Sequence, residues 1–177
     1  MVLEAELREA GIEYRGAAEK LSKAREKAAR ALSKAVEAEL PDLKLGAAKF
    51  IVDRQVDVER VSPHGIDQIA FHVQTNPGTT PGPMMKVASG GELSRFLLAL
   101  KVVLADRGSV PVLIFDEIDT GVGGAVADAI GKRLARLAQS VQVLTVTHAP
   151  QVAARAQIHL LIEKQAIEEG AFIRTHV

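Results

Sequence analysis

Two short apolar segments, each followed by polar residues suited to chemistry, constrain the fold of this chain most. Residues 112–115 read Val-Leu-Ile-Phe and predict a strand buried on both faces. Residues 141–147 are rich in β-branched residues and predict a second buried strand. Apolar residues at helical spacing predict a helix between them, over 125–138. Strands that alternate with helices in this way predict an α/β fold with a mainly parallel sheet and flanking helices.

An acidic pair, Asp116 and Glu117, directly follows the first of these strands. Open α/β sheets hold their ligands at the carboxyl ends of strands. Two adjacent acids at that position have no obvious packing role, so we expect them to divide the chemistry. Asp116 would hold magnesium, directly or through water, and Glu117 would orient and activate the attacking water. The alternative is that the pair only caps the helix that begins near Gly124.

A glycine turn, Ser89-Gly90-Gly91-Glu92, opens the helical pattern before the first strand. Ser89 is a natural N-cap, and Glu92 stands three residues on, where it completes a capping box. The glycines allow a ligand close to the backbone, and the free N–H groups and dipole of a helix start attract phosphate. The alternative is an ordinary capped helix. The apolar face of that helix comprises Phe96, Leu97, Ala99, Leu100, Val103 and Leu104.

A histidine, His148, ends the second strand, since Pro150 prevents the strand from continuing. A neutral histidine there can donate a hydrogen bond to a terminal phosphate or position a water molecule. The alternative is a structural role. We interpret the remaining histidines as structural, because they lack metal-ligand spacing. They are His64, His72, His159 and His176.

Residues 1–40 carry a heptad repeat that predicts one long coiled-coil helix, which Pro41 ends. Its seam is rich in alanine, so the partner helix must pack close. That partner lies outside the chain, and we expect the isolated helix to fray or to pair with another chain. The two registers of the seam are Leu7, Tyr14, Leu21, Ala28 and Ala35, and Leu3, Ala10, Ala17, Ala24, Ala31 and Ala38.

The same helix is locally basic. Its basic residues either contact DNA phosphates or form a solvated helix face. They are Lys20, Lys23, Arg25, Lys27, Arg30 and Lys34.

The rest of the chain predicts further short elements. We expect strands at 47–58 and 66–73, a flexible loop at 76–83, a short helix at 151–156, and a strand at 158–163. The segment 168–170 reads as a hairpin turn that returns through 171–177.

Composition excludes several classes of protein. Hydrophobic residues make up 47% of the 177 residues, which argues against disorder. The 22 Lys and Arg balance the 22 Asp and Glu, so net charge indicates no overall footprint for nucleic acid. The chain has no cysteine and therefore no disulfide framework or thiol nucleophile. Nothing at its start resembles a signal peptide, and Lys101 interrupts the longest apolar stretch, so we expect a cytoplasmic location.

In order and spacing, these motifs resemble those of ABC-type ATPases. Residues 88–95 resemble the signature loop, 112–117 the Walker B strand, 118–123 the D-loop, and His148 the switch histidine. Their detailed wording, Ala-Ser-Gly-Gly-Glu-Leu-Ser-Arg, Phe-Asp-Glu-Ile-Asp-Thr-Gly-Val-Gly-Gly and Thr-His-Ala-Pro-Gln-Val-Ala-Ala, is similar to that of bacterial DNA repair ATPases of the SMC-like group. The strong resemblance covers about residues 60–165. A P-loop of the form Gly-x-x-x-x-Gly-Lys-Ser/Thr is absent from the sequence.

The resemblance implies the C-terminal half of an ATPase head. Residues 1–40 would be the returning coiled-coil helix and 41–177 the C-terminal lobe, completed by an N-terminal portion that carries the P-loop. The chain alone is then expected to be inactive. The resemblance further implies a homodimer of heads that acts on DNA, at ends or along double-stranded DNA, in double-strand break repair and recombination. Its location would be the cytoplasm, in association with the nucleoid.

The resemblance also assigns roles around ATP sandwiched between two heads. Asp116 would hold magnesium, Glu117 would be the catalytic base, and His148 would sense the γ-phosphate. The residues expected to bind ATP are Ser89, Gly90, Gly91, Glu92 and Asp119.

Two other functions remain open. The ATPase subunit of a membrane transporter shares the same motifs, although the heptad helix at 1–40 counts against it. A non-catalytic module that dimerises through the coil is favoured by the missing P-loop. The intact pair of Asp116 and Glu117 argues that the complete protein hydrolyses ATP.

Overall fold

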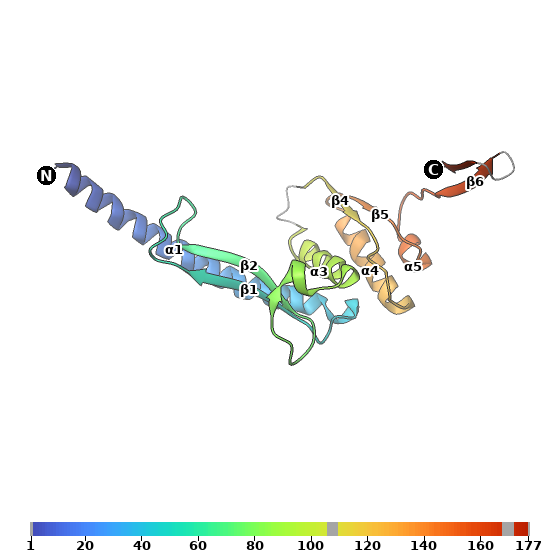
Figure 1. The fold of residues 1–177 in the computed structure, drawn as a ribbon, viewed down its shortest axis with the longest axis horizontal. Coiled ribbons are helices and arrows are strands. Elements are labelled where there is room, and N and C mark those ends of the chain that lie inside the picture. Colours follow the sequence, from blue (N-terminus) through green and yellow to red (C-terminus); the bar gives the residue numbers. More distant parts are fainter. Residues whose placement is uncertain (1, 106–109, 168–171, 177) are drawn as a thin grey trace.

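A computed structural model describes the backbone of residues 2–105, 110–167 and 172–176 (Figure 1). A long helix, α1 (Val2–Glu39), extends from an α/β region that holds the remaining helices. These are the 3₁₀ turn η1 (Pro41–Leu43), α2 (Met84–Val87), α3 (Gly90–Val103), α4 (Gly124–Leu137) and α5 (Pro150–Ala153). Within these residues, no helix combines the length and apolar character that a membrane span requires.

The described strands form three separate sheets. β1 (Lys49–Val56), β2 (Asp67–Gln74) and β3 (Gly82–Pro83) are antiparallel in that order. β4 (Val112–Phe115) and β5 (Gln142–Thr145) are parallel, and helix α4 connects them. β6 (Glu163–Ile167) and β7 (Phe172–His176) form an antiparallel hairpin. The expected long helix followed by an α/β region with parallel strands is therefore confirmed, with the parallel pairing of the described strands limited to β4 and β5.

Three sequence predictions differ from the structure. The strand expected at 158–163 is wrong, because residues 158–162 belong to no strand, with a bend at 157–158, and β6 begins only at Glu163. The end of the loop expected at 76–83 is ordered, since Gly82 and Pro83 pair with β2 and α2 follows. The helix expected at 151–156 spans only Pro150–Ala153. The turn expected at 168–170 lies outside the described residues, whereas the pairing of β6 with β7 is as predicted.

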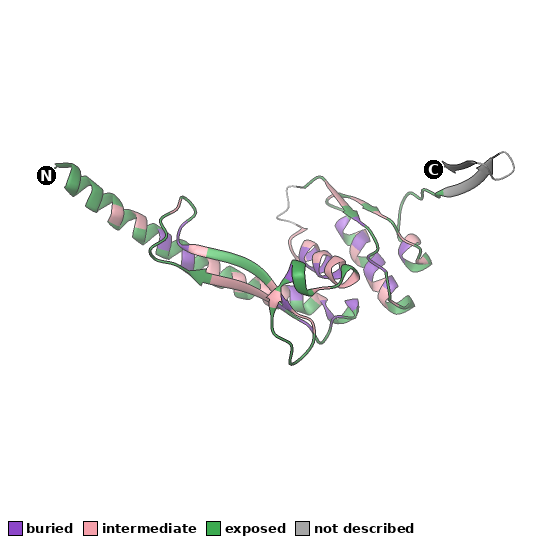
Figure 2. Ribbon diagram, viewed as in Figure 1, coloured by how far each residue is buried: buried purple, intermediate pink, exposed green. Residues whose placement is uncertain are grey.

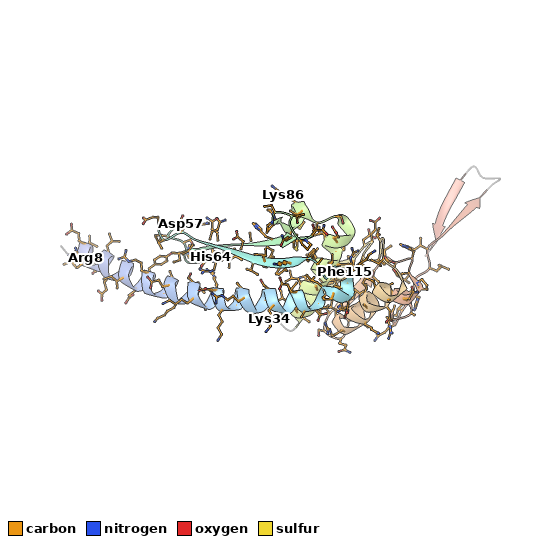
Figure 3. All side chains as sticks on the ribbon, turned by 90° about the horizontal axis from the view of Figure 1, so that it is seen from below. Arg8, Lys34, Asp57, His64, Lys86 and Phe115 are labelled. Atoms are coloured by element: carbon orange, nitrogen blue, oxygen red, sulfur yellow. The ribbon has the colours of Figure 1, made fainter. Side chains whose placement is uncertain are left out.

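The β1–β2 hairpin packs along α1, an arrangement that the sequence did not predict. Figure 3 shows the hairpin loop, marked by Asp57 and His64, beside the helix. The face of α1 that it covers buries Ala18, Ser22 and Val36. Figure 2 shows that α1 beyond the hairpin is mostly exposed.

The predicted heptad seam lies beside this buried face and is largely exposed. Leu3 and Leu7 are 79% and 75% exposed, and Leu21 is 40% exposed. Tyr14 is an exception, because its hydroxyl accepts from the amide of Ser62 at 3.0 Å and donates to the Ser62 carbonyl at 3.2 Å. The hairpin therefore leaves the rest of the seam open for another helix.

A buried carboxylate joins the hairpin to α1. The side chain of Asp67 is fully buried, and its Oδ1 accepts from Ser22 Oγ and from Arg54 Nη1, both at 2.8 Å. Its Oδ2 accepts from Arg25 Nη1 at 3.1 Å. One carboxylate thus connects two residues of the helix with one of the neighbouring strand.

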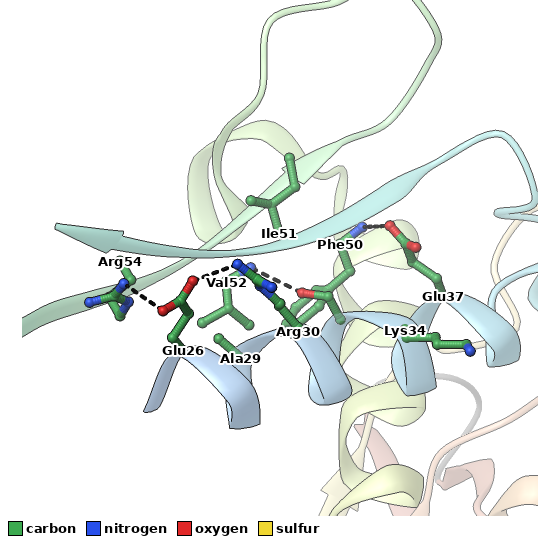
Figure 4. A pocket seen from close by; sticks show the side chains of 10 residues that line it. Glu26, Ala29, Arg30, Lys34, Glu37, Phe50, Ile51, Val52 and Arg54 are labelled. Carbon is green, nitrogen blue, oxygen red and sulfur yellow. Dashed lines mark hydrogen bonds and ion pairs between the residues drawn. The ribbon is translucent and has the colours of Figure 1, made fainter. Parts of the chain in front are cut away.

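The outer edge of β1 is closed by side chains of α1 (Figure 4). The amide of Phe50 donates to Glu37 Oε1 at 3.2 Å, and the amide of Val52 donates to Ser33 Oγ at 3.3 Å. An open strand edge presents unpaired amides to other chains. Here the helix takes the place of a neighbouring strand.

We expect acid to weaken the junction at Asp67. Burial pushes the pKa of this carboxyl upward, but the hydrogen bonds led by Arg54 and Ser22 hold it below the ordinary value of 3.8. A folded pKa below the unfolded one gives stability that is complete at neutral pH and is lost as pH falls from about 5 through the folded pKa. Urea unfolding of the wild type and of Asp67→Asn should therefore differ most near pH 7 and converge in acid. A difference that does not change with pH would contradict this assignment.

One hydrophobic core joins the root of α1 to the α/β region. Its largest fully buried side chains come from α1, η1, β1, β2, α3, α4 and the loops beside them: Val36, Leu40, Leu43, Phe50, Val73, Phe96, Leu98, Ile118, Ile130 and Leu137.

One face of the β4–β5 sheet remains uncovered. Ile114 is 72% exposed, and Leu144 and Val146 are 42% and 59% exposed. The prediction that 112–115 is buried on both faces is therefore wrong for this chain. The described elements pack on one side of the sheet only, so any cover for the other side must come from outside these residues.

Candidate nucleotide site

The parallel register of β4 and β5 brings their two motifs to one edge of the sheet. Phe115 lies opposite Thr145, and the amide of Val146 donates to the Phe115 carbonyl at 2.9 Å. Both strands therefore end side by side, with the acidic pair after one and His148 after the other. This is the ligand-binding edge of an open α/β sheet.

The acidic pair is free for chemistry. Asp116 and Glu117 are both exposed, and neither carboxylate has a hydrogen-bond or ion-pair partner within the described part of the chain. The pair does not cap α4, because the N-cap of that helix is Gly123. The alternative role as a helix cap is thus not observed.

Glu117 has a strained backbone. Its φ of +53° lies in the left-handed region, which few residues other than glycine adopt. Such a conformation costs about 1–3 kcal/mol and persists where the surroundings enforce it, often at functional sites. The amide of Thr120 donates to the Glu117 carbonyl at 3.2 Å and closes the turn. Nothing in the sequence indicated this conformation.

Asp119 is buried rather than exposed to a ligand. Its Oδ2 accepts from Thr147 Oγ1 at 2.7 Å and from the amide of Ala149 at 3.0 Å. Burial pushes the pKa of this carboxyl upward, and the hydrogen bond from Thr147 leads the interactions that hold it below 3.8. The sequence predicted contact with ATP for Asp119. The structure shows the residue tying the D-loop to the loop that carries His148, and the contact with ATP stays a prediction.

The signature turn begins α3 as the sequence predicts. Ser89 is the N-cap, and its amide and hydroxyl both donate to Glu92 Oε2, at 3.0 and 2.9 Å, which confirms the capping box. Gly90 faces open space, since a Cβ placed there would meet no atom within 4 Å. The start of this helix is therefore accessible to an anion.

The signature helix also contacts the D-loop. A Cβ on Gly91 would lie 3.2 Å from Arg95 Nη1 and 3.4 Å from the Thr120 carbonyl oxygen, so the turn lies against the D-loop. The buried Arg95 donates from Nη1 to that oxygen at 3.4 Å. Arg95 forms part of the quoted signature wording, but the sequence gave no indication of this contact.

The C-terminal end of α1 and the turn that follows it contact the same region. Lys44 Nζ donates to the carbonyl of Gly121 in the D-loop at 3.3 Å. Glu39 accepts from Arg133 Nε at 2.8 Å and from Arg136 Nη2 at 2.7 Å. The end of the long helix is thereby joined to the D-loop and to α4.

Comparison with known proteins identifies the relatives of this arrangement. No family model matches the chain. The DNA repair protein RecN of Rickettsia bellii is 45% identical over 157 residues, which cover 89% of this chain and 28% of that protein. RecN of Xylella fastidiosa is 44% identical over 156 residues, and RecN of Vibrio cholerae is 45% identical over 149 residues. The chain is a homologue of the C-terminal part of RecN.

The chain spans about 28% of the length of the RecN proteins that it matches first. Their high identity over nearly the whole chain confirms the expected similarity to the group of DNA repair proteins that includes RecN. It also favours this group over transporter subunits, which the sequence motifs alone had left open.

Solved structures of SMC heads share the fold. The Smc head domain with a coiled coil and joint from Pyrococcus yayanosii has a TM-score of 0.59 at 20% identity and covers 98% of this chain and 32% of that chain. The Smc head with an extended coiled coil from Pyrococcus furiosus, solved with the C-terminal domain of ScpA, has a TM-score of 0.52 at 16% identity. That match covers 83% of this chain and 35% of the other. These similarities confirm the fold class of the RecN-like chain.

The residues at the strand edge fit magnesium and ATP in part. An exposed, unpartnered carboxylate such as that of Asp116 is a ligand that Mg²⁺ prefers. The described residues hold no cluster of three His, Asp or Glu side chains for a metal, so the other ligands would be water and phosphate. The open start of α3 suits a phosphate, whereas the P-loop that cradles the nucleotide is absent from the sequence.

Proposed function

We propose that this chain is the C-terminal half of an ATP-hydrolysing head in a RecN-like protein of bacterial DNA double-strand break repair and recombination. The observation that carries the proposal is the pair of free carboxylates, Asp116 and Glu117, beside His148 at the edge of a parallel sheet. The similarity to RecN supports the repair role. We place the protein in the cytoplasm, in association with the nucleoid.

Each residue of the site has a distinct task in this proposal. Glu117 orients the attacking water and accepts its proton, and His148 contacts the γ-phosphate. Asp116 holds magnesium, which supplies charge stabilisation to the phosphates when bound. The open helix start at Ser89, Gly90, Gly91 and Glu92 serves ATP bound to a second head.

We infer a second head because the resemblance to ABC-type ATPases implies that ATP is sandwiched between two heads. The signature turn opens α3, whereas the acidic pair follows β4. In the proposed homodimer, each nucleotide lies between the acidic pair of one head and the signature turn of the other. Nucleotide then closes the heads, and hydrolysis parts them.

The N-terminal portion of the same protein is the proposed cover for the open face of the sheet. The exposed side chains of Ile114, Leu144 and Val146 form an apolar surface beside the nucleotide edge. The segment 157–162 adds further exposed apolar side chains, those of Ile158, Leu160, Leu161 and Ile162. A strand or helix that carries the P-loop would bury this surface and complete the head.

DNA is the proposed substrate of the complete protein. Lys20, Lys23 and Lys27 are exposed on one side of α1 at three- and four-residue spacing, and none has an acidic partner among the residues described. Arg25 belongs elsewhere, because it binds the buried Asp67. The free lysines suit contact with phosphates, which leaves the solvated helix face as the alternative.

The decisive experiment is ATP turnover by this chain alone and in a mixture with the N-terminal portion that carries the P-loop. Both are assayed with and without linear DNA. We expect turnover only in the mixture, raised by DNA, because neither half alone holds a complete site. A mixture whose N-terminal portion lacks the P-loop lysine is the matched control. No turnover in a folded, associated mixture would favour the non-catalytic module, which the exposed seam of α1 also allows.

A further inference from the structure

One buried carboxylate, that of Asp119, holds the loop that carries His148. The side chain of Asp119 is only 1% exposed, and its Oδ2 accepts from Thr147 Oγ1 at 2.7 Å and from the amide of Ala149 at 3.0 Å. These two donors stand directly before and after His148. The carboxylate therefore fixes the backbone on both sides of the histidine.

The imidazole of His148 takes part in neither of these two hydrogen bonds. The side chain of His148 is 82% exposed, and its Nδ1 lies 3.8 Å from Asp119 Oδ2. The other oxygen, Oδ1, is buried and has no hydrogen-bond partner within the described chain. The Nδ1 atom thus faces the oxygen that already accepts two hydrogen bonds, at a distance beyond a hydrogen bond, so its interaction with the carboxylate is electrostatic.

A carboxylate in this position selects the orientation of the ring. A lone pair on Nδ1 would be repelled by the negative oxygens, whereas a proton on Nδ1 is attracted. In Ser-His-Asp triads a direct hydrogen bond from Nδ1 to a carboxylate holds the imidazole in one tautomer and one orientation. At 3.8 Å the attraction to Asp119 is weaker, but it too favours a proton on Nδ1 and leaves Nε2 on the opposite side of the ring. Nε2 accepts a hydrogen bond from water when the ring is neutral and donates one to phosphate when the ring is charged.

We infer that Asp119 is a positioning residue, which holds His148 so that Nε2 meets the γ-phosphate or the attacking water, and is not itself an ATP ligand. The inference rests on the proposed ATPase function and refines the expected role of Asp119. It also explains why a carboxylate follows the catalytic glutamate by two residues yet lies buried.

A double-mutant cycle in the full-length protein tests this role. Asp119→Asn should lower kcat about 10- to 100-fold, as the loss of an orienting carboxylate does elsewhere, with little change in KM. His148→Ala should lower kcat at least as much. The double variant should be no slower than His148→Ala alone, because a residue that acts through another adds nothing once that other is gone.

Two further variants separate positioning from folding. Thr147→Val keeps the carboxylate and the shape of the loop but removes one donor to Oδ2, so it should lower kcat less than Asp119→Asn does. This variant supplies the test if Asp119→Asn fails to fold. Asp57→Asn is the matched control, since this carboxylate lies in the loop between β1 and β2 and accepts from the amide of Glu59 at 3.1 Å. Its turnover should equal that of the wild type.

Substitutions of the histidine identify the nitrogen that acts. The amide of glutamine reaches the position of Nε2, and the amide of asparagine reaches that of Nδ1. His148→Gln should therefore retain more turnover than His148→Asn. The reverse order would overturn the assignment of Nε2.

The outcomes distinguish this inference from the function beneath it. Multiplicative effects of Asp119→Asn and His148→Ala, or a rise in KM at unchanged kcat, would show that Asp119 acts on its own and would overturn only the positioning role. Full turnover by His148→Ala would remove both His148 and its positioning residue from catalysis. A wild-type protein without any ATP turnover would overturn the proposed function itself.

Discussion

Replacing Glu117 by glutamine in the full-length protein leaves ATP binding intact and lowers turnover by about 10²- to 10⁴-fold, the usual contribution of a general base. Glutamine keeps the size of the side chain and its capacity to orient water, but it cannot accept a proton. The exposed carboxylate has no partner within the described residues, so its removal breaks no contact of the fold. The measurement is ATP affinity together with turnover at saturating ATP.

Glu59→Gln is the matched control for that experiment. Glu59 is an exposed glutamate of the loop between β1 and β2, and Figure 3 shows this loop, marked by Asp57 and His64, beside α1. The same chemical change there should leave turnover unaltered. Unchanged turnover in Glu117→Gln would remove Glu117 from the role of base.

Phe50→Ala should lower the free energy of unfolding by about 3–5 kcal/mol. The ring is 1% exposed and lies in the core that joins α1 to α3. It also packs against Phe71, with ring centroids 5.4 Å apart and planes tilted by 42°. Truncation removes the ring from the core and leaves a cavity that its neighbours cannot fill completely. Urea unfolding of this chain, followed by circular dichroism, gives the loss directly.

Phe71→Ala provides the comparison, because it deletes the other ring of the same pair. Phe71 is 36% exposed, so its loss creates no closed cavity. We expect a loss of about 1 kcal/mol, the order of an aromatic pair contact. Equal losses for the two variants would mean that the core does not extend to β1 as described.

The parts of the fold that were predictable are those whose chemistry is local in sequence. The capping box of Ser89 and Glu92 spans four residues, and the strand bounds at 112–115 follow from one apolar run. The acids and the histidine then fall at one edge because parallel strands end together. Only the last step needs a contact between distant residues, the pairing of β4 with β5, and the alternation of strands and helices predicts that pairing.

The hairpin on α1 was missed because its contacts are distant in sequence. Ser62 lies 48 residues from Tyr14, and Asp67 lies 45 residues from Ser22. Ala18 and Ser22 also stand one residue after members of the predicted heptad seam. Two neighbouring faces of one helix have nearly the same spacing, so periodicity alone did not reveal the second one.

Residues 112–115 were expected to be buried on both faces for a related reason. An apolar run indicates that a strand is covered, but it does not indicate which chain provides the cover. The exposure of Ile114 is consistent with a cover from outside the described residues. Likewise, the buried position of Asp119 follows from Thr147 and Ala149, some thirty residues further along.

The C-terminal end of α1 is held in place, and the rest of the helix extends far from it. Its 38 residues span about 57 Å at 1.5 Å per residue, while Lys44 and the ion pairs of Arg133 anchor its base beside the D-loop. Figure 3 shows α1 from Arg8, near its free end, past Lys34, near its C-terminal end. A tilt of about 5° at the anchored end displaces the far tip by about 5 Å over that length. A small rotation of the end beside the D-loop would therefore become a large displacement at the free end of α1.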